Sequence, residues 1–491
     1  MSSSNLDLLH REKMSTVDTA WLRMDSDGNL MMIVSVLMFD QPVDPVRFRQ
    51  TMRKRFLPYR RFRSRVVQDV TGAWWQEQEV DLEQHILHTR LPSAKASSNK
   101  AALEQMVGVL SATPLDPDMP LWQMHVIDNC VGEDGKVRQA VIIRIHHCIA
   151  DGIALVGVLL SMFDPTRSGS EQGAIDEDAV EPEVETSIDA EGNPWLQIFQ
   201  PVTKTTISAI NLSTSMMTKY LWTLAESNKF LAKFTDMAHM TGQLTQDAIK
   251  LLAMTEDSKT RLKGKPQGAK HVAWSEPLPL AEVKVIGRAL GSSINDVLMA
   301  SVAGAIGAYL RSKGDVVSAD TEVRAMVPVN LRKSSRQEKL GNAFGLVPLV
   351  LPVGIEDPIA RLDEVRRRMD ELKGGYQALV AMVLLGVLGA TPKQMQSEIQ
   401  NYFAKKATAV MSNVPGPQNP LYLAGSQLEQ IMFWVPQSGD IGVGVSILSY
   451  NGGVQFGIVT DDAIADDPHQ IIHRFAPEFE KLVLLALMSE W

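Results

Sequence analysis

The chain has 491 residues, a formal net charge of −9, 45% hydrophobic residues and 21% charged residues. This composition is typical of a folded globular protein, and the length favours two domains over a single core. The negative net charge argues against nucleic acid as the main partner. The two cysteines, Cys130 and Cys148, are too few for a disulfide framework and suit a reducing compartment.

Targeting and membrane signals are weak along the whole sequence. The amino-terminal residues lack a basic region followed by an apolar core, so we predict no signal peptide. The longest apolar run, 378–390, is shorter than the roughly 20 residues that a bilayer requires. It predicts a buried helix or the wall of a lipid-sized pocket, and we expect a cytoplasmic protein.

The first functional candidate along the chain is a basic segment, residues 47–65, with nine basic residues and no acidic ones. Asp44 and Pro45 predict a helix that starts just before it, and a strand is predicted after Pro58. One interpretation is an ordinary solvated face. The other is attraction to anionic lipid headgroups or to a polyphosphate-bearing substrate.

A histidine segment, residues 146–152, carries the most specific chemical signal. It reads His-His-Cys-Ile-Ala-Asp-Gly, follows a strand-like run at 139–145 and precedes a helix-like run at 153–160. An imidazole at a strand end can reach a ligand, although a polar strand edge before an Asp-Gly turn is the plainer interpretation. Because neighbouring strand residues point to opposite faces, His146 and His147 cannot easily share an ion, and we predict no metal site.

A shift in composition divides the chain. Residues 169–194 hold nine acidic residues and no Lys or Arg, which predicts an acidic, mobile linker. We therefore expect an amino-terminal domain at 1–165, the linker followed by helices at 166–270, and a carboxy-terminal domain at 271–491. The expected elements give a mixed α/β fold, with strands at 30–39, 323–329 and 442–449 and helices at 195–249, 280–289, 294–310 and 469–487.

Four further segments accompany the histidine segment. They are Pro120-Leu121-Trp122, Ser293-Ile294-Asn295-Asp296-Val297, Val327-Pro328-Val329-Asn330-Leu331-Arg332 and Ser412-Asn413-Val414-Pro415-Gly416-Pro417. Each alone is an ordinary helix cap, strand end or turn. All five in this order within one chain form a strong combined signal.

Together with residues 14–24, these segments make the chain resemble the bacterial wax ester synthase/diacylglycerol acyltransferase family. That family is similar to the chloramphenicol acetyltransferase-like acyltransferases, which share the His-His-x3-Asp-Gly signature. The resemblance covers essentially the whole chain and implies two similar α/β domains with an active-site tunnel at their interface. One departure, Asp128-Asn129-Cys130 in place of a Glu-Gly type turn, puts only local loop geometry in doubt.

The resemblance also implies roles for individual residues. His147 is the expected general base, and Asn295 is the candidate oxyanion donor, with a helix cap as its alternative role. Asp151 is expected to hold the loop by pairing with an arginine, for which Arg332 is the candidate. Supporting roles fall to His146, Gly152 and Asp296, and a role in shaping or bracing the tunnel falls to Pro120, Leu121, Trp122, Asn330, Ser412, Asn413, Pro415 and Gly416.

The activity implied by the resemblance is acyl transfer from a long-chain acyl-CoA to a fatty alcohol, to diacylglycerol or to both. No covalent acyl-enzyme and no cofactor are expected, because acyl-CoA is a substrate. The basic segment would allow peripheral binding at the inner membrane face and at lipid inclusions. Two alternatives stay open: a condensation-domain-type amide or ester synthase that uses carrier-bound acyl groups, and a non-catalytic lipid-binding protein.

Overall fold

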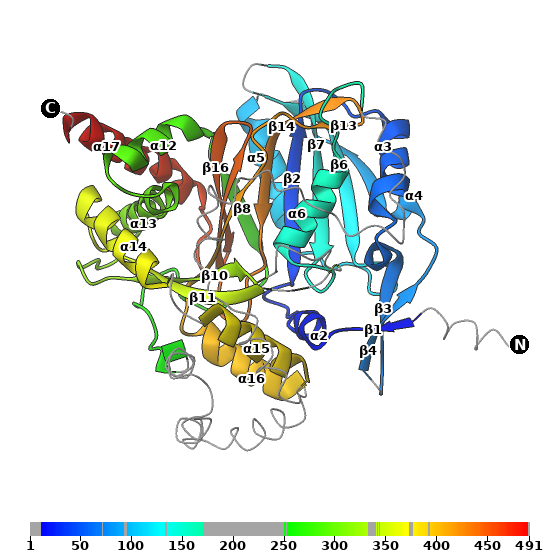
Figure 1. Ribbon diagram of the computed structural model, residues 1–491, viewed down its shortest axis with the longest axis horizontal. Coiled ribbons are helices and arrows are strands. Elements are labelled where there is room, and N and C mark those ends of the chain that lie inside the picture. Colours follow the sequence, from blue (N-terminus) through cyan, green and yellow to red (C-terminus); the bar gives the residue numbers. More distant parts are fainter. Residues whose placement is uncertain are drawn as a thin grey trace, which may run out of the picture.

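The computed structural model is a mixed α/β structure built on two large sheets, which confirms the predicted fold class (Figure 1). It describes residues 11–489 apart from 71, 93–95, 133–134, 170–249, 252, 332–339, 341, 343, 373–376 and 391–392. The helices predicted over 195–249 and the residue Arg332 therefore lie outside the described residues, as does most of the acidic stretch.

The first large sheet carries the histidine segment near its centre. Its strands lie in the order β13-β14-β2-β7-β6-β5, and all neighbours are antiparallel except β5 and β6. Their bounds are β2 Met32–Phe39, β5 Ile86–Arg90, β6 Trp122–Val131, β7 Val137–His146, β13 Tyr422–Leu423 and β14 Ser426–Trp434. The strands predicted at 30–39 and 139–145 are thus confirmed.

Both faces of strand β7 are covered, which explains its unbroken apolar run. Ile143 packs in one core with helix α6 (Gly152–Ser161), and Ile142 packs in another with helix α5 (Ala96–Ser111). The helix predicted over 153–160 is confirmed as α6. Helices therefore cover both faces of this sheet, and they enclose the residues at the end of β7 (Figure 1).

Two strands of this first sheet come from the far end of the sequence. β14 pairs antiparallel with β2 and β13 pairs with β14, so residues 422–434 complete the amino-terminal sheet. The contiguous division at 271–491 does not anticipate this crossover. The two halves of the chain are consequently joined by strand pairing as well as by side-chain contacts.

The second large sheet has the order β11-β10-β12-β15-β16-β8, with β9 paired to β16. Its strands are β8 Lys270–Trp274, β9 Leu278–Pro279, β10 Val323–Asn330, β11 Phe344–Leu351, β12 Ala409–Pro415, β15 Val443–Tyr450 and β16 Gly453–Asp461. β12 is parallel to both β10 and β15, and the other pairs are antiparallel. The strands predicted at 323–329 and 442–449 are confirmed as β10 and β15.

Strands β10 and β12 pair over only a short stretch. Ala325 pairs with Ala409 and Met326 with Val410, whereas β10 continues to Asn330 and β12 to Pro415. β12 stays paired with β15 along its full length. The second sheet therefore forks toward the carboxyl ends of β10 and β12, where two of the singled-out segments lie.

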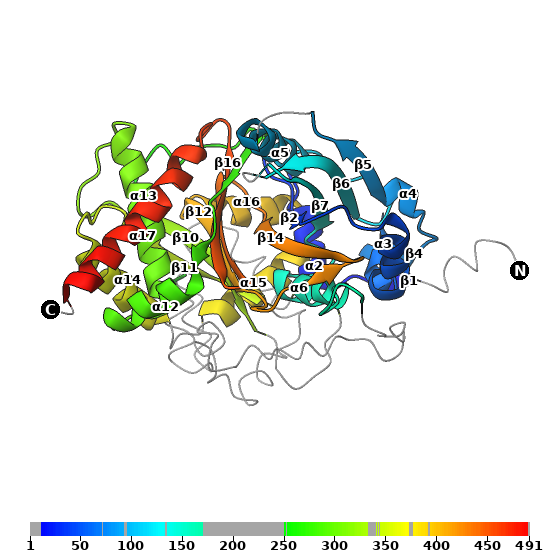
Figure 2. The same cartoon turned by 90° about the horizontal axis from the view of Figure 1, so that it is seen from above.

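Helices cover the outer side of the second sheet (Figure 2). They are α12 Leu280–Ala289, α13 Ile294–Ser312, α14 Pro358–Leu372 and α17 His469–Ser489, and the predictions at 280–289, 294–310 and 469–487 are confirmed. Among the described residues no single helix has the length and hydropathy of a bilayer span. α12 and α13 pass that test only as a pair bent by 98°, and α13 is buried in the core of the second sheet.

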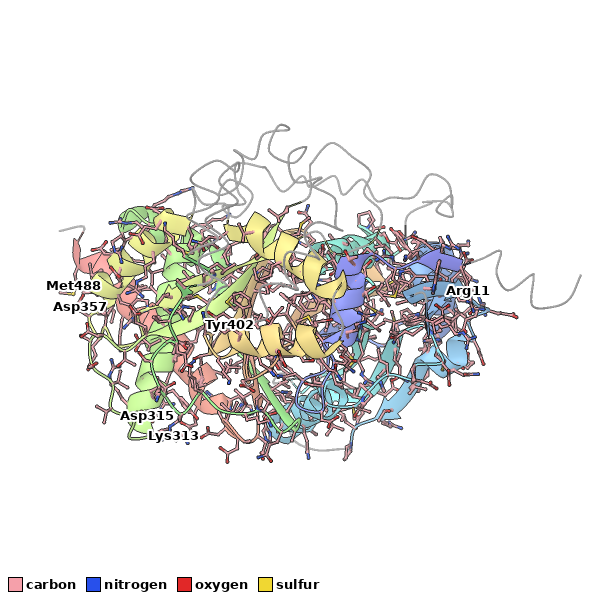
Figure 3. All side chains as sticks on the ribbon, turned by 90° about the horizontal axis from the view of Figure 1, so that it is seen from below. Arg11, Lys313, Asp315, Asp357, Tyr402 and Met488 are labelled. Atoms are coloured by element: carbon pink, nitrogen blue, oxygen red, sulfur yellow. The ribbon has the colours of Figure 1, made fainter. Side chains whose placement is uncertain are left out.

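Three more helices lie below the two large sheets in the view of Figure 1. They are α2 Thr16–Arg23, α15 Gln377–Ala390, which contains the apolar run, and α16 Lys393–Ala404. The side chain of Gln396 on α16 donates to the carbonyl oxygen of Ala20 on α2 at 2.8 Å. A small sheet of β1 Arg11–Lys13, β4 Gly72–Glu77 and β3 Ser64–Asp69 lies at the end of the molecule opposite α17, with Arg11 and Met488 at the two ends (Figure 3).

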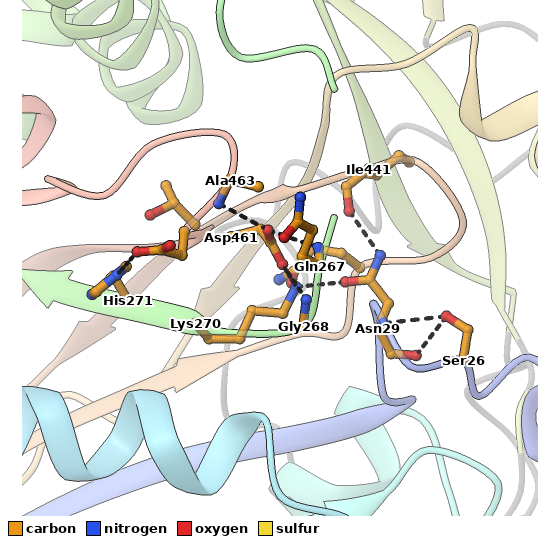
Figure 4. A network of polar contacts seen from close by, with 12 residues as sticks. Ser26, Asn29, Gln267, Gly268, Lys270, His271, Ile441, Asp461 and Ala463 are labelled. Carbon is orange, nitrogen blue, oxygen red and sulfur yellow. Dashed lines mark hydrogen bonds and ion pairs between the residues drawn. The ribbon is translucent and has the colours of Figure 1, made fainter. Parts of the chain in front are cut away.

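A buried polar network joins the two large sheets (Figure 4). Lys270 of β8 forms an ion pair with Asp461 of β16 at 3.2 Å and donates to the side-chain oxygen of Asn29 at 2.7 Å. Asn29, just before β2, donates to the carbonyl oxygens of Gly439 and Ile441. Removing one partner of such a buried pair typically costs about 3–5 kcal/mol, so this network stabilises the docking of the two halves.

Candidate active site

The two histidines lie where β7 ends and the turn before α6 begins. The backbone N–H of His146 donates to the carbonyl oxygen of Leu121 at 2.9 Å, and that of His147 donates to the carbonyl oxygen of Met31 at 2.7 Å. These bonds run to the neighbouring strands on either side, so the main chain is held from both directions. Among the described residues no group of three or more His, Cys, Asp or Glu side chains could hold a metal ion.

The imidazole of His147 is enclosed by aromatic rings from both halves of the chain. It stacks on Trp21 of α2 with ring centroids 4.1 Å apart and an interplanar angle of 19°, and the ring of Phe344 of β11 lies at 5.4 Å. Burial lowers the pKa of His147 to about 4, although the Asp151 carboxylate acts in the opposite direction. The ring is therefore neutral at neutral pH, which is the form that can accept a proton.

The ring of His146 is engaged at both nitrogens. Its Nε2 lies 3.2 Å from the carboxylate of Asp25, and its Nδ1 accepts a hydrogen bond from the backbone N–H of Cys148 at 3.1 Å. Because Nδ1 accepts, the ring proton is on Nε2 and is donated to Asp25. Asp25 also accepts the backbone N–H of Met31, so these contacts tie the turn to the segment that leads into β2.

Asp151 caps the helix that follows the histidines. Its side chain accepts the backbone N–H of Ala154 at 3.0 Å, and its backbone is extended as an N-cap requires. Arg332, the predicted partner of Asp151, lies outside the described residues. A Cβ atom built on Gly152, the first residue of α6, would meet no atom of the described residues within 4 Å.

On the other side of the interface, Asn295 and Asp296 begin helix α13. Asp296 and Ser293 form a reciprocal capping box, in which each side chain accepts the backbone N–H of the other residue. Asn295 is buried and accepts a hydrogen bond from the side chain of Asn413 at 2.7 Å. The amide nitrogen of Asn295 is also buried and has no hydrogen-bond partner among the described residues.

The carboxyl end of β12 supplies a hydrogen-bond partner of Asn295, and the carboxyl end of β10 lies on the other branch of the forked sheet. Asn330 is the last residue of β10, and Ser412 and Asn413 lie on β12 at the fork of the sheet. Pro415 ends β12. Gly416 follows, and a Cβ there would lie 2.4 Å from the carbonyl oxygen of Ser449, so no larger residue fits this close approach.

The segment 120–122 packs beneath the histidines. Leu121 supplies the carbonyl oxygen that His146 binds, and Pro120 precedes it directly. Trp122 is buried, donates from its indole nitrogen to the carbonyl oxygen of Phe62 at 2.9 Å, and stacks on His85 with ring centroids 4.2 Å apart. The indole of Trp122 is therefore fully used in packing and in one hydrogen bond.

Comparison with protein-family models shows the family of this chain. The model of the wax ester synthase/diacylglycerol acyltransferase catalytic domain matches residues 14–298, more than half of the chain, and the model of the carboxy-terminal domain of the same family matches residues 340–483. The chain belongs to this family. It is an acyltransferase.

Relatives and solved structures extend the match over nearly the full length. A probable diacylglycerol O-acyltransferase of Mycobacterium tuberculosis is 25% identical, with 96% of each chain covered. A wax ester synthase/diacylglycerol acyltransferase of Arabidopsis thaliana is 21% identical, covering 89% of this chain and 84% of the other.

Among solved structures, the wax ester synthase/diacylglycerol acyltransferase from Marinobacter aquaeolei VT8 has a TM-score of 0.65 at 18% identity, covering 97% and 100% of the two chains. The first condensation domain of the calcium-dependent antibiotic synthetase has a TM-score of 0.57 at 13% identity, covering 97% and 96%. These two likenesses concern the fold.

In this family member the basic segment 47–65 is largely neutralised by acidic partners. Arg55 forms a buried ion pair with Asp164, and Arg61 forms one with Asp18. Further pairs join Arg49 to Glu83, Arg60 to Glu12 and Glu77, and Arg63 to Glu77. Arg53 and Lys54 are exposed in the π-helical segment Met52–Phe56. This segment continues from α3 (Pro45–Thr51), which Asp44 caps as predicted.

Sequence reasoning assigned no role to several residues that surround His147. Trp21 and Asp18 lie within the segment 14–24 that carried part of the family resemblance, but nothing local marks them as neighbours of a histidine more than 120 residues away. Phe344 and Asn342 lie just past an undescribed stretch and carry no motif. Only the packing of α2 and β11 on the end of β7 brings these side chains to the imidazole.

Proposed function

We propose that this acyltransferase moves a long-chain acyl group from acyl-CoA to the hydroxyl group of a fatty alcohol, of diacylglycerol or of both. The observation that carries the proposal is the neutral, buried imidazole of His147 at the contact between the two halves. On the opposite half, the amide nitrogen of Asn295 has no hydrogen bond among the described residues. The names of the relatives in Marinobacter, Mycobacterium and Arabidopsis support the same pair of acceptors.

His147 is the general base of the proposed reaction. An alcohol is a weak nucleophile until its proton is removed, and a positioned base contributes roughly 10²–10⁴-fold. The imidazole takes the hydroxyl proton while the oxygen attacks the thioester carbonyl carbon. When the tetrahedral intermediate collapses, the C–S bond breaks and the imidazolium returns the proton to the coenzyme A thiolate, so no covalent acyl-enzyme forms.

Asn295 is the proposed donor to the negative oxygen of that intermediate. Its amide N–H groups are buried and carry no hydrogen bond among the described residues, whereas its oxygen is held by Asn413. A donor that is fixed before the charge develops pays no reorganisation cost, and one such donor is worth about 2.7–4 kcal/mol.

The test measures thiol release by the purified full-length chain from palmitoyl-CoA, with either hexadecanol or dipalmitoylglycerol as acceptor. We expect release that depends on an acceptor, and a loss of roughly 10²–10⁴-fold in His147→Gln. His88→Gln, at an exposed histidine of β5, is the matched control and should keep full activity.

Each alternative predicts a different result in the same assay. A non-catalytic lipid-binding protein releases no thiol with any acceptor. A condensation-type synthase works with acyl-pantetheine carriers and an amine but not with free acyl-CoA and an alcohol. Equal release by wild type and His147→Gln would contradict the assignment of the base.

A further inference from the structure

Two side chains from distant parts of the sequence bind the main chain of the histidine turn, residues 147–149. Asn342, just before β11, donates from its amide nitrogen to the carbonyl oxygen of His147 at 2.9 Å. Arg61 donates from Nη1 to the carbonyl oxygen of Ile149 at 2.6 Å. The turn that carries the candidate base is therefore held by one side chain from each half of the chain.

Asp18 of α2 accepts a second hydrogen bond from each of these two side chains. Its Oδ1 accepts from the amide nitrogen of Asn342 at 2.8 Å, and its Oδ2 accepts from Nη2 of Arg61 at 3.0 Å. Since both partners of the Asn342 amide nitrogen are acceptors, they use both of its hydrogens and fix its orientation. Each donor side chain thus bridges the carboxylate of Asp18 to one carbonyl oxygen of the histidine turn.

A carboxylate suits this arrangement better than any other group of its size. An ionised carboxylate offers an acceptor oxygen to each of two donors, whereas an amide offers one oxygen and one donor group. Asp18 is 1% exposed, so a donor that lost its oxygen there would stay unsatisfied at a cost in free energy. The guanidinium of Arg61 also lies over the ring of Trp75, at 5.2 Å from its centroid. The two oxygens of Asp18 consequently set the positions of both donors.

Helix α2 contacts the ring of the base as well as its main chain. Trp21 lies three residues after Asp18, on the same side of α2, and its ring stacks on the imidazole of His147. α2 is also bonded to the second half, because Gln396 donates to the carbonyl oxygen of Ala20. The position of α2 therefore decides where the imidazole lies.

We propose that Asp18 is a positioning residue, which fixes the imidazole of His147 by holding two donor side chains against the histidine turn. The inference rests on the proposed function, because a general base must stay within hydrogen-bond reach of the hydroxyl group. A displacement of about 1 Å in such a site can cost about 10²-fold in rate. Because Asn342 comes from the second half, the turn is fully held only when the two halves are docked.

Asp18→Asn is the direct test, because it keeps the size of the side chain but leaves one acceptor oxygen for two donors. In the thiol-release assay, kcat should fall by roughly 10–100-fold, with little change in the KM for palmitoyl-CoA. Asp164→Asn is the matched control, because it breaks the buried ion pair with Arg55 beyond the far end of α6. It should keep its kcat. An equal kcat in Asp18→Asn and wild type would overturn the proposal.

A second variant covers the case in which Asp18→Asn does not fold, since that change removes the charge that balances Arg61. Asn342→Leu removes the bonds to His147 and Asp18 but leaves the ion pair of Asp18 with Arg61 intact. It should lower kcat by roughly 3–30-fold, a smaller loss, because Arg61 still holds the carbonyl oxygen of Ile149. An unchanged kcat in Asn342→Leu would contradict the bridge from the second half.

The double variant Asp18→Asn/Asn342→Leu shows whether the two residues act through one contact. It should be no slower than Asp18→Asn alone, because one oxygen then suffices for the one donor that remains. Losses that multiply would show independent roles and would contradict the proposal. Asn99→Leu, at a buried asparagine that bonds Asn129 and Val131 away from the site, is the control for Asn342→Leu and should keep its kcat.

Hydrogen exchange followed by mass spectrometry measures the histidine turn without relying on activity. Peptides that cover residues 146–152 should exchange faster in Asp18→Asn than in wild type, because the turn opens more often. Peptides of α13 should exchange as in wild type, and Asp164→Asn should leave the turn unchanged. Unchanged exchange of the turn in Asp18→Asn would overturn the proposal.

The failure of this inference differs from failure of the proposed function. If wild type releases no thiol but exchange of the turn rises in Asp18→Asn and not in Asp164→Asn, Asp18 holds the turn and the proposed reaction fails. If thiol release depends on His147 but Asp18→Asn changes neither kcat nor exchange of the turn, the reaction stands and the positioning role fails.

Discussion

The two sides of the candidate active site are built in opposite ways. On the first half, His147 is gripped through its ring by Trp21 and through its main chain by Met31 and Asn342. On the second half, Asn295 is held by one side-chain hydrogen bond, and its amide nitrogen has no partner in the described part of the chain. A base needs a fixed ring and one tautomer, whereas an oxyanion donor needs a free N–H. His147 has the many contacts that a general base requires, and Asn295 has the free N–H that an oxyanion donor requires.

Apart from replacement of His147 itself, the largest effect is expected at Asn295. Asn295→Ala should lower kcat by about 10²–10³-fold, because the developing negative oxygen loses its donor. Asn295→Asp is the matched variant: it keeps the acceptor for Asn413 and suits a helix start, but it offers no donor. It should be as slow as Asn295→Ala, measured by thiol release. Full activity in Asn295→Asp would assign Asn295 to bracing alone.

Removing the ring of Trp21 tests the contacts that hold His147. Trp21→Ala should lower kcat by about 3–10-fold, in line with the roughly 0.5–1.5 kcal/mol of an aromatic pair. It should also admit water to His147 and raise its pKa from about 4 toward the ordinary 6.5. Since the neutral ring is the base, activity falls as pH drops through that pKa, so the acid limb of kcat/KM should move to higher pH.

A matched control separates this effect from lost packing. Trp274→Ala, at a buried tryptophan of β8 in a different core, should lower stability without moving the acid limb. An acid limb at the same pH in Trp21→Ala and wild type would show that the stack does not set the protonation of His147.

The turn between the histidines and α6 should give a smaller effect, on stability. Asp151→Ala removes the cap on Ala154 and should cost about 0.5–2 kcal/mol, seen as a lower Tm. Asp151→Asn preserves a capping oxygen, so its Tm should stay close to that of wild type. An equal loss in both variants would show that the charge of Asp151, and not the cap, stabilises the turn.

The smallest effect is expected at the basic segment, because most of its charges are already paired. If it binds membranes, the exposed pair Arg53 and Lys54 should contribute about 1 kcal/mol each to binding of anionic vesicles, and less at high salt. Vesicle sedimentation of Arg53→Glu/Lys54→Glu measures this. Arg49→Glu, at a residue paired with Glu83, is the comparison variant. An equal loss of vesicle binding in both variants would show that overall charge, and not the exposed pair, determines binding.

Local patterns in the sequence were sufficient to predict much of the architecture. The strand that ends at His146, the turn through Asp151 and the helix after it could be predicted because a short apolar run and an Asp-Gly turn are local signals. The capping box at Ser293 and Asp296 is equally local. The five motifs also sufficed to predict the family.

Only the tertiary structure decided what surrounds those motifs. Residues 422–434 complete the first sheet, Asn342 reaches a carbonyl oxygen 195 residues away, and acidic partners neutralise most of the basic segment. Such contacts depend on how whole elements pack, and no spacing in the sequence encodes them. The sequence by itself determined that two histidines stand where β7 ends, and packing decided which side chains surround His147 and set its pKa.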